Sequence, residues 1–292
     1  SIRKRNDMLF ATQTQNAVEA YGFTEGIRLL CEAGYPALDL SLNVADLSEL
    51  PSREEQERTK EIAAGYGVVF RQAHAPFGYQ KFITRIQPEL WRVFEVVARF
   101  GVKQMIVHPL QPGRYYGHEK EIFDLNVQFY RGLVPLIRQY GVKVAIENMW
   151  QRNPTSNLIV DDICADPKEL ADVFDAVDDP DSFTVCLDVG HVALCNREPE
   201  DAVRIIGHDR LGALHVHDVD YIDDLHTLPG VGRIKWDPVC RALGEIDYTG
   251  DLTLEADNFF TRFETEFYPT VARFMAERAK FLAEKVDQYR KN

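Results

Sequence analysis

Short apolar runs alternate with longer amphipathic stretches along almost the whole chain. The apolar runs cover residues 8–12, 37–42, 68–73, 104–107, 142–146, 184–187, 212–216 and 251–254. Most are nearly continuous in Val, Ile, Leu, Ala and Phe, which is typical of parallel strands that are buried on both faces. The pattern therefore predicts eight parallel strands.

The stretches between these runs have helical periodicity. They cover residues 24–33, 52–64, 88–100, 119–140, 166–177, 198–206, 236–243 and 262–288. Ser52 stands three residues before Glu55, the spacing of a capping box, and Gly141 directly follows one stretch. Eight strand–helix alternations in a chain of 292 residues predict an α/β fold, a (β/α)8 TIM barrel. We expect one domain over residues 1–292 with a long C-terminal helix at about 262–288.

The alternative fold is an open, doubly wound parallel sheet. Such a sheet normally carries a glycine-rich phosphate loop after its first strand. Here the first run is followed by Gln13-Thr14-Gln15-Asn16, so the barrel is favoured.

Composition narrows the class of protein. Hydrophobic residues make up 45% and charged residues 27%, as in soluble globular proteins, and no apolar run reaches the roughly 18 residues of a membrane span. The five cysteines are scattered and odd in number, which favours reduced thiols and a cytoplasmic location. The basic start, residues 1–6, is not followed by an apolar signal core. The net charge of −13 counts against nucleic acid as a partner, because proteins that grip phosphate backbones usually carry a basic patch.

Metal-ligand residue types stand where six of the apolar runs end. They are His74, His108, Glu147, Asp188 with His191, His215 with His217, and Glu255. In a barrel these ends meet at one rim, and buried carboxylates there need a partner. A divalent cation provides one and also takes imidazole ligands, with Mn, Zn, Co, Fe and Mg all compatible.

Each residue taken alone has a plainer interpretation. A single carboxylate at a strand end is more often a helix cap, and a single His74 is more often a hydrogen-bonded core residue. The succession of six such ends is what favours a metal site. His118 and His208 lack this placement, and we expect them at the surface or at a cap.

The seventh run carries two histidines that point to the same side of the strand, since they are two residues apart. His217 lies nearer the rim and is the predicted ligand, whereas His215 is expected to support it or to lie in the core. Asp224 and His226 have the spacing to chelate a second ion, and a solvated acidic loop is the alternative. Arg233 is a candidate for capping that loop or for binding a substrate hydroxyl or phosphate.

The order of these motifs resembles the xylose-isomerase-like barrel superfamily, which includes endonuclease IV, sugar-phosphate isomerases and ketose 3-epimerases. The resemblance rests on Glu147-Asn148, Asp188-Val189-Gly190-His191, His215-Val216-His217-Asp218, Leu228-Pro229-Gly230-Val231-Gly232 and Glu255. Similarity to the epimerases implies one metal held by Glu147, Asp188, His217 and Glu255. It also implies that Glu147 and Glu255 act as acid and base and that His191 contacts a substrate oxygen.

Similarity to endonuclease IV extends to its nine-ligand, three-metal pattern. The matching residues are His74, His108, Glu147, Asp188, His191, His217, Asp224, His226 and Glu255. The loops around them are aromatic and mixed in charge, which suits a small polyol better than DNA. The chain also departs from the ketose 3-epimerases, because it lacks their second substrate-binding glutamate after Glu147 and has Asp223 where they place an arginine.

These observations predict a metal-dependent isomerase or epimerase of a small sugar or sugar-like polyol. It would abstract a proton next to a carbonyl, with the enediolate stabilised by the metal; dehydratase or lyase chemistry begins in the same way. Trp150 and Arg233 are candidate substrate contacts. The alternatives are a phosphodiesterase acting on abasic DNA and a sugar-binding barrel without catalysis, which the presence of both glutamates disfavours. The long final helix has the length to pack on the barrel or to contact a second copy in a homo-oligomer.

Overall fold

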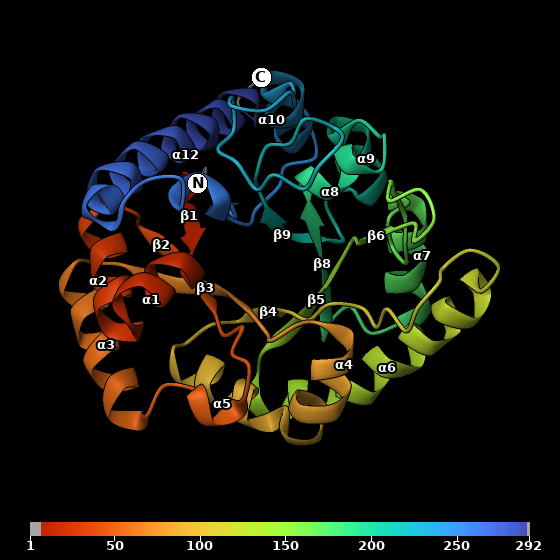
Figure 1. Cartoon of the computed structure of the whole chain (residues 1–292), viewed down its shortest axis with the longest axis horizontal. Coiled ribbons are helices and arrows are strands. Elements are labelled where there is room, and N and C mark those ends of the chain that lie inside the picture. Colours follow the sequence, from red (N-terminus) through yellow and green to blue (C-terminus); the bar gives the residue numbers. More distant parts are fainter. Residues whose placement is uncertain (1–6, 291–292) are drawn as a thin grey trace, which may run out of the picture.

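The computed structural model describes residues 7–290, so the basic segment 1–6 lies outside the described residues. Eight parallel strands form a barrel, with helices around its outside (Figure 1). The strands are β1 (Phe10–Gln13), β2 (Ala37–Ser41), β3 (Val69–His74), β4 (Gln104–Ile106), β5 (Lys143–Glu147), β8 (Phe183–Asp188), β9 (Leu211–His215) and β10 (Leu252–Leu254). Each lies within or beside one of the eight predicted runs, which confirms the barrel over the doubly wound sheet.

The barrel closes between its seventh and eighth strands. The hydrogen-bonded order runs β10-β1-β2-β3-β4-β5-β8-β9. A parallel bridge between Val216 and Leu254 joins the two ends, with Val216 N 2.8 Å from Thr253 O and Glu255 N 3.0 Å from Val216 O. Closure brings the C-terminal ends of all eight strands around one axis.

The outer helices cover the strands. They are α2 (Phe23–Glu32), α3 (Arg53–Gly65), α5 (Trp91–Arg99), α6 (Glu119–Tyr140), α7 (Pro167–Val177), α9 (Pro199–Ile206), α10 (Trp236–Glu245) and α12 (Tyr268–Arg290). The capping box at the start of α3 is confirmed: Ser52 Oγ accepts from Glu55 N and Glu55 Oε2 accepts from Ser52 N. Gly141 ends α6 in the left-handed conformation. The last helix begins at Tyr268, six residues later than predicted.

Several short elements were not predicted. They are α1 (Gln15–Tyr21), α4 (Tyr79–Lys81), α8 (Val189–Leu194), α11 (Asp257–Phe260), the hairpin of β6 (Trp150–Arg152) with β7 (Ile159–Asp161), and the turns Leu47–Glu49, Phe82–Ile86, Gln87–Glu89 and Thr265–Phe267. Most follow the C-terminal end of a barrel strand. They form the walls of the rim where the candidate ligands lie.

The two faces of the barrel strands carry different residues. Leu38, Val144, Leu187 and similar large side chains pack outward against the helices in the main core. The barrel interior holds a separate small cluster of Ile106, Ala145, Cys186 and Ala213. Side chains alternate along a strand. The inward position two residues after Ala145, Cys186 and Ala213 therefore falls on Glu147, Asp188 and His215, so a small apolar layer forms the floor below the ligands.

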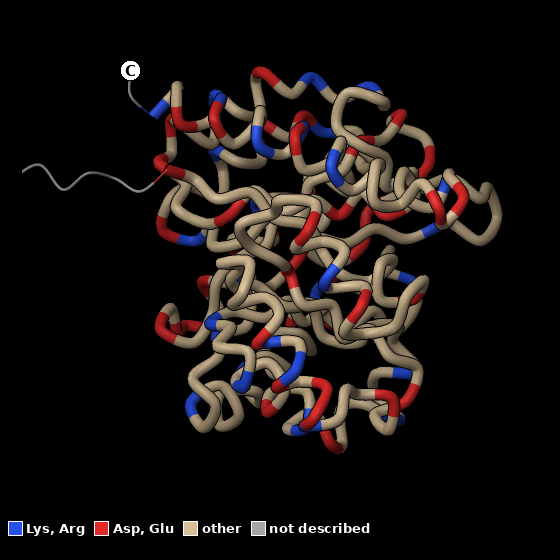
Figure 2. The backbone as a smooth tube through the Cα atoms, turned by 90° about the vertical axis from the view of Figure 1, so that its left-hand side faces the viewer, with Lys and Arg blue, Asp and Glu red and all other residues tan. Residues whose placement is uncertain are grey.

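Three further features concern the helices, the cysteines and the distribution of surface charge. Within residues 7–290, no helix combines the length and apolar content needed to cross a membrane. All five cysteines are buried and free. Figure 2 shows positive and negative residues interspersed on the side of the molecule that it presents.

A buried carboxylate at the N-terminal end of the last barrel strand leads to a prediction about stability. Asp251 precedes β10, is 5% exposed and has Arg71 Nε 3.2 Å from Oδ2. Burial raises the pKa of Asp251 to about 6, although Arg71 opposes the shift. Because the folded protein holds this proton more tightly than the unfolded chain, the group destabilises the fold as pH rises from about 4 to 6, by up to about 3 kcal/mol.

The variant Asp251→Asn mimics the protonated acid and should be more stable than the wild type above pH 6. The difference should shrink toward pH 4, and it already includes the attraction to Arg71, which opposes the pKa shift. Urea unfolding in EDTA at pH 4.5 and 7.5 measures the effect, with the exposed Asp124→Asn as the matched control. A difference that does not change between the two pH values would contradict the prediction.

Candidate functional site

Four ligand-type side chains form the centre of the rim. Glu147, Asp188 and His215 are the last residues of β5, β8 and β9, and Glu255 directly follows β10. Asp188 and His215 are also register partners. One ligand atom from each of the four lies within 4.8 Å of the others, close enough for all four to share one ion.

The structure brings His215, not His217, to Glu147 and Glu255. His215 Nδ1 lies 2.7 Å from Glu147 Oε1 and 3.5 Å from Glu255 Oε2. His217 lies beyond the end of β9, where its Nε2 is 2.9 Å from Asp188 Oδ1 and its ring stacks on His226 at 3.9 Å. Both rings face the barrel interior, as expected. The residue of β9 that lies level with Glu147 and Asp188 is His215, not His217. This depth depends on where neighbouring strands end.

Two further groups flank the centre. His74, His108 and Glu147 form one, with His108 Nε2 2.9 Å from Glu147 Oε2 and 3.1 Å from His74 Nε2. The other comprises His191, His217, Asp224 and His226. Within this group, His226 Nε2 lies 3.1 Å from Asp224 Oδ2. Asp188 lies between the centre and this second group. All nine residues of the predicted set, together with His215, thus line one continuous site.

Backbone carbonyls fix the orientation of three of the imidazoles. The Nδ1 atoms of His74, His191 and His226 lie 2.7–2.9 Å from the carbonyl oxygens of Ala75, Asn148 and Glu255, respectively. A carbonyl oxygen only accepts, so each Nδ1 carries a proton and Nε2 is the atom available to a metal ion. These Nε2 atoms face the site, which is the arrangement that a metal-binding histidine requires. Without an ion, the Nε2 of His226 donates to Asp224 Oδ2, a contact that raises the pKa of His226 well above its usual value despite burial.

The two central glutamates have opposite electrostatic environments. Burial favours the neutral acid at Glu147, but the neighbouring His215 and His108 outweigh it and bring the pKa of Glu147 well below its usual value. Burial also raises the pKa of Glu255, and Asp188 and Glu147 add to this, so it lies well above its usual value despite His215 and His226. The neighbours of Glu147 thus favour its ionised form, whereas those of Glu255 favour its neutral form.

A buried carboxylate that the sequence analysis did not select organises the loop carrying Asp224 and His226. Asp218 accepts hydrogen bonds of 2.8–3.0 Å from the backbone N–H groups of residues 219, 230 and 234 and from Trp236 Nε1. A Cβ on Gly232 would approach Asp218 Oδ1 to 2.4 Å, so only glycine fits there. Gly230 and Gly232 thus let the loop close tightly around this carboxylate.

The cleft above the ligands is partly apolar. A cavity of about 310 Å³ is lined by Phe77, Met149 and Trp150 together with the ligand residues. It adjoins a cavity of about 200 Å³ that is more polar, with Gln15, Ser41 and Asn43 among its lining residues. Trp150, a predicted substrate contact, therefore lies in the cleft.

Two cationic side chains lie beside the cleft and are paired with neighbouring polar groups. Lys81 Nζ donates to Asn43 Oδ1 at 2.9 Å, and Arg152 pairs with Asp223 at 3.2 Å. Arg233 is exposed and lies outside both cavity linings, so the structure does not bring it to the site as expected. Among the described residues, neither cavity is lined by Lys or Arg.

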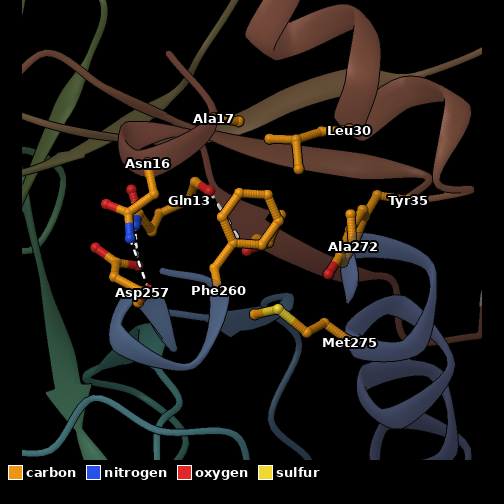
Figure 3. A pocket seen from close by; sticks show the side chains of 10 residues that line it. Gln13, Asn16, Ala17, Leu30, Tyr35, Asp257, Phe260, Ala272 and Met275 are labelled. Carbon is orange, nitrogen blue, oxygen red and sulfur yellow. Dashed lines mark hydrogen bonds between the residues drawn. The ribbon is translucent and has the colours of Figure 1, made fainter. Parts of the chain in front are cut away.

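A smaller space of about 20 Å³ lies beside the cleft, between β1, α2 and α12 (Figure 3). Its apolar side chains include Leu30, Phe260 and Met275. At its polar end Asn16 Nδ2 donates to Asp257 O at 2.7 Å and Gln13 Nε2 donates to the Asp257 carboxylate. Its volume suits a water molecule and not a substrate.

The two histidines expected away from the site lie at the surface. His118 is the N-cap residue of α6, with Nδ1 3.2 Å from Glu121 Oε2. His208 Nδ1 lies 3.0 Å from Ile246 O. Both are exposed, and neither contacts the ligand groups.

Two proteins of one organism match part of the chain in sequence. An uncharacterised protein of Methanocaldococcus jannaschii is 27% identical over 157 residues, which are 53% of this chain and 50% of that protein. A second one from the same organism is 24% identical over 200 residues, 64% of this chain and 70% of the relative. The chain thus spans about half the length of the first of these relatives.

Solved structures share the fold over nearly the whole chain. A D-tagatose 3-epimerase-like protein superposes with a TM-score of 0.72 at 20% identity, covering 96% of this chain and 100% of that one. D-psicose 3-epimerase in the presence of D-fructose gives 0.70 at 17% identity, covering 94% and 99%. The IOLI protein with a bound zinc atom gives 0.67 at 19% identity, covering 97% and 99%.

A family model matches most of the chain, over residues 27–277, and its description is the xylose isomerase-like TIM barrel. The match includes every residue of the three ligand groups. The chain belongs to the xylose isomerase-like TIM barrel family.

Proposed function

We propose that the protein is a metal-dependent isomerase or epimerase of a small sugar or sugar-like polyol. The observation that carries the proposal is the pair of carboxyl groups of Glu147 and Glu255, which flank the His215 imidazole at the centre of the rim, with oxygens 2.7 and 3.5 Å from its Nδ1. Two carboxyl groups whose environments separate their pKa values can act as base and acid in one reaction. Proton removal next to a carbonyl needs such a pair.

The donor set fits a divalent cation held by Glu147, Asp188, His215 and Glu255. Carboxylate oxygens and an imidazole nitrogen suit Mn, Zn, Co, Fe or Mg. The fixed tautomers of His74, His191 and His226 support further ions in the flanking groups. When bound, the central ion supplies a Lewis acid that stabilises negative charge developing on a substrate oxygen. His217, the ligand expected from the sequence, is assigned to the group with Asp224.

The chain's own residues would move the proton. Glu147, whose neighbours favour the carboxylate, would accept a proton from the substrate carbon, and Glu255, whose neighbours favour the acid, would return one. His191 lines the cleft and its Nδ1 is engaged by Asn148 O at 2.8 Å, so its Nε2 would contact a substrate oxygen wherever no flanking ion occupies it. Phe77, Met149 and Trp150 would exclude water from the reacting carbon.

The cleft supports a small uncharged substrate. Its described lining lacks Lys and Arg, which a phosphate group would require, and combines aromatic faces with amide and hydroxyl groups. That mixture suits a polyol. The sugar epimerases that share the fold, one of them solved in the presence of D-fructose, also support a sugar-like substrate.

Solvent exchange tests the reaction. With Mn²⁺ in heavy water, the wild type should incorporate deuterium next to the carbonyl of a ketose or inositol ketone. Glu147→Gln and Glu255→Gln should each lower the exchange rate by about 10²–10⁴-fold, since each removes an acid–base group. NMR measures the exchange, metal content is determined for each variant, and Glu169→Gln outside the cleft is the matched control. Absence of exchange in every ketone tested would refute the proposal.

Histidine substitutions test the metal assignment. His215→Ala should weaken the most tightly held ion by at least about 100-fold, because losing a ligand costs more than losing one of its hydrogen-bond partners. His217→Ala should leave that ion in place and weaken another. Elemental analysis with Mn²⁺ titration distinguishes the two, and dialysis against EDTA should lower the wild-type unfolding midpoint reversibly. The opposite ranking of the two variants would restore His217 to the central site.

The complete three-group ligand set also favours a second function, an endonuclease IV-like phosphodiesterase acting on abasic DNA. It requires several ions per chain and a rim that binds a charged duplex. We expect no binding to an abasic duplex at low salt, since the net charge is −13 and the described cleft lining lacks cationic residues. Cleavage of that duplex by the metal-loaded protein, with no ketone exchange, would make the phosphodiesterase the function.

A further inference from the structure

Directly below the central ligands, the barrel interior contains a carboxylate that the proposed mechanism does not use. Asp39 lies on β2 and is 0% exposed. Its Oδ2 accepts from Gln72 Nε2 at 2.6 Å, whereas its Oδ1 has no hydrogen-bond partner among residues 7–290. A buried carboxylate with an unused oxygen costs free energy, so a compensating donor close to Asp39 is expected.

The lower edge of His215 faces this carboxylate. His215 Nε2 lies 3.7 Å from Asp39 Oδ2 and, like Asp39 Oδ1, has no hydrogen-bond partner within the described chain. The separation exceeds a typical N–H···O distance by roughly 0.8 Å, which a small rotation of the imidazole closes. His215 is thus held between Asp39 below and Glu147 and Glu255 above.

This arrangement completes a pattern set by the other histidines. His74, His191 and His226 each have one ring nitrogen engaged by a backbone carbonyl and the other directed to the site. For His215 the site-facing atom is Nδ1, so the atom that needs an acceptor is Nε2. The Cys186 thiol also lies close to this ring, but sulfur is a weak acceptor. Asp39 is the strong acceptor on that side.

We propose that Asp39 is a positioning residue for the metal centre. It accepts the Nε2 proton of His215, fixes the tautomer whose Nδ1 lone pair points to the ion, and places a negative charge behind that ligand. The inference rests on the proposed ion at Glu147, Asp188, His215 and Glu255. Carboxylates hydrogen-bonded to a metal-binding histidine raise its basicity and set its ring orientation.

Metal affinity tests this role without requiring turnover. Asp39→Ala removes the acceptor and should weaken the central Mn²⁺ by about 10–100-fold, the usual effect of losing such a partner. Asp39→Asn keeps a neutral acceptor and should give an intermediate loss. Free Mn²⁺ measured by electron paramagnetic resonance reports binding. Asp287→Asn, the same change at a buried carboxylate on the outer helix α12, should bind Mn²⁺ within about twofold of the wild type.

A spectroscopic measurement separates positioning from a general loss of structure. In the Zn²⁺-loaded wild type, ¹⁵N chemical shifts should show His215 protonated at Nε2 and metal-bound at Nδ1. In Asp39→Ala that signature should be lost while circular dichroism stays native. Unchanged Mn²⁺ affinity in Asp39→Ala, or a wild-type His215 bound through Nε2, would overturn the inference.

The two proposals fail separately. Metal affinity that depends on Asp39 without any ketone exchange would keep the positioning role and refute the isomerase. Ketone exchange with an affinity independent of Asp39 would do the reverse.

Discussion

The burial of several carboxylates within one cleft is the constraint around which this rim is arranged. Glu147 and Asp188 are almost completely buried, and Asp224, Glu255 and Asp257 lie near them. Removing such charges from water costs several kcal/mol each unless opposite charges or strong donors compensate. The chain meets this demand with imidazoles from five segments and a single hydrogen-bonded loop. Desolvation raises the pKa of both Glu147 and Glu255, and their different neighbours separate the two values, because His215 and His108 outweigh burial only at Glu147.

The interior of the barrel contains small and polar side chains below these buried charged groups. Barrel interiors are usually filled by bulky branched side chains. Here the layer below the ligands includes Ala145, Cys186 and Ala213, and Asp39 and Gln72 occupy neighbouring strands. Small residues leave room for the His215 ring at the end of β9. They also allow a second polar layer to sit underneath it, which a wall of valine and isoleucine would exclude.

Much of this architecture could be predicted from the sequence, because continuous apolar runs and strand-end ligands are local signals. The depth of each ligand could not, since it depends on where neighbouring strands end. His215 and His217 share a face, and only the register of β8 with β9 places Asp188 opposite His215. The hairpin of β6 and β7 and the short α1 carry too few residues for a clear period. Sequence proximity alone suggests Arg233 as a site residue. Nothing in the sequence distinguishes Asp218 from other acidic residues, because its four donors come from positions spread over residues 219–236.

The hydrogen bonds to Asp218 hold the ligand residues of this loop in place without fixing the sequence of its outer turn. The segment from residue 219 to 236 is long, yet its anchor points at both ends converge on a single carboxylate fixed at the end of β9. Asp224 and His226 therefore inherit the rigidity of the barrel, although they lie on a loop. The outer turn at Tyr221, Ile222 and Asp223 is free of that anchor and largely faces solvent. The protein can thus vary what its rim presents to a substrate while keeping unchanged how its ligands are held.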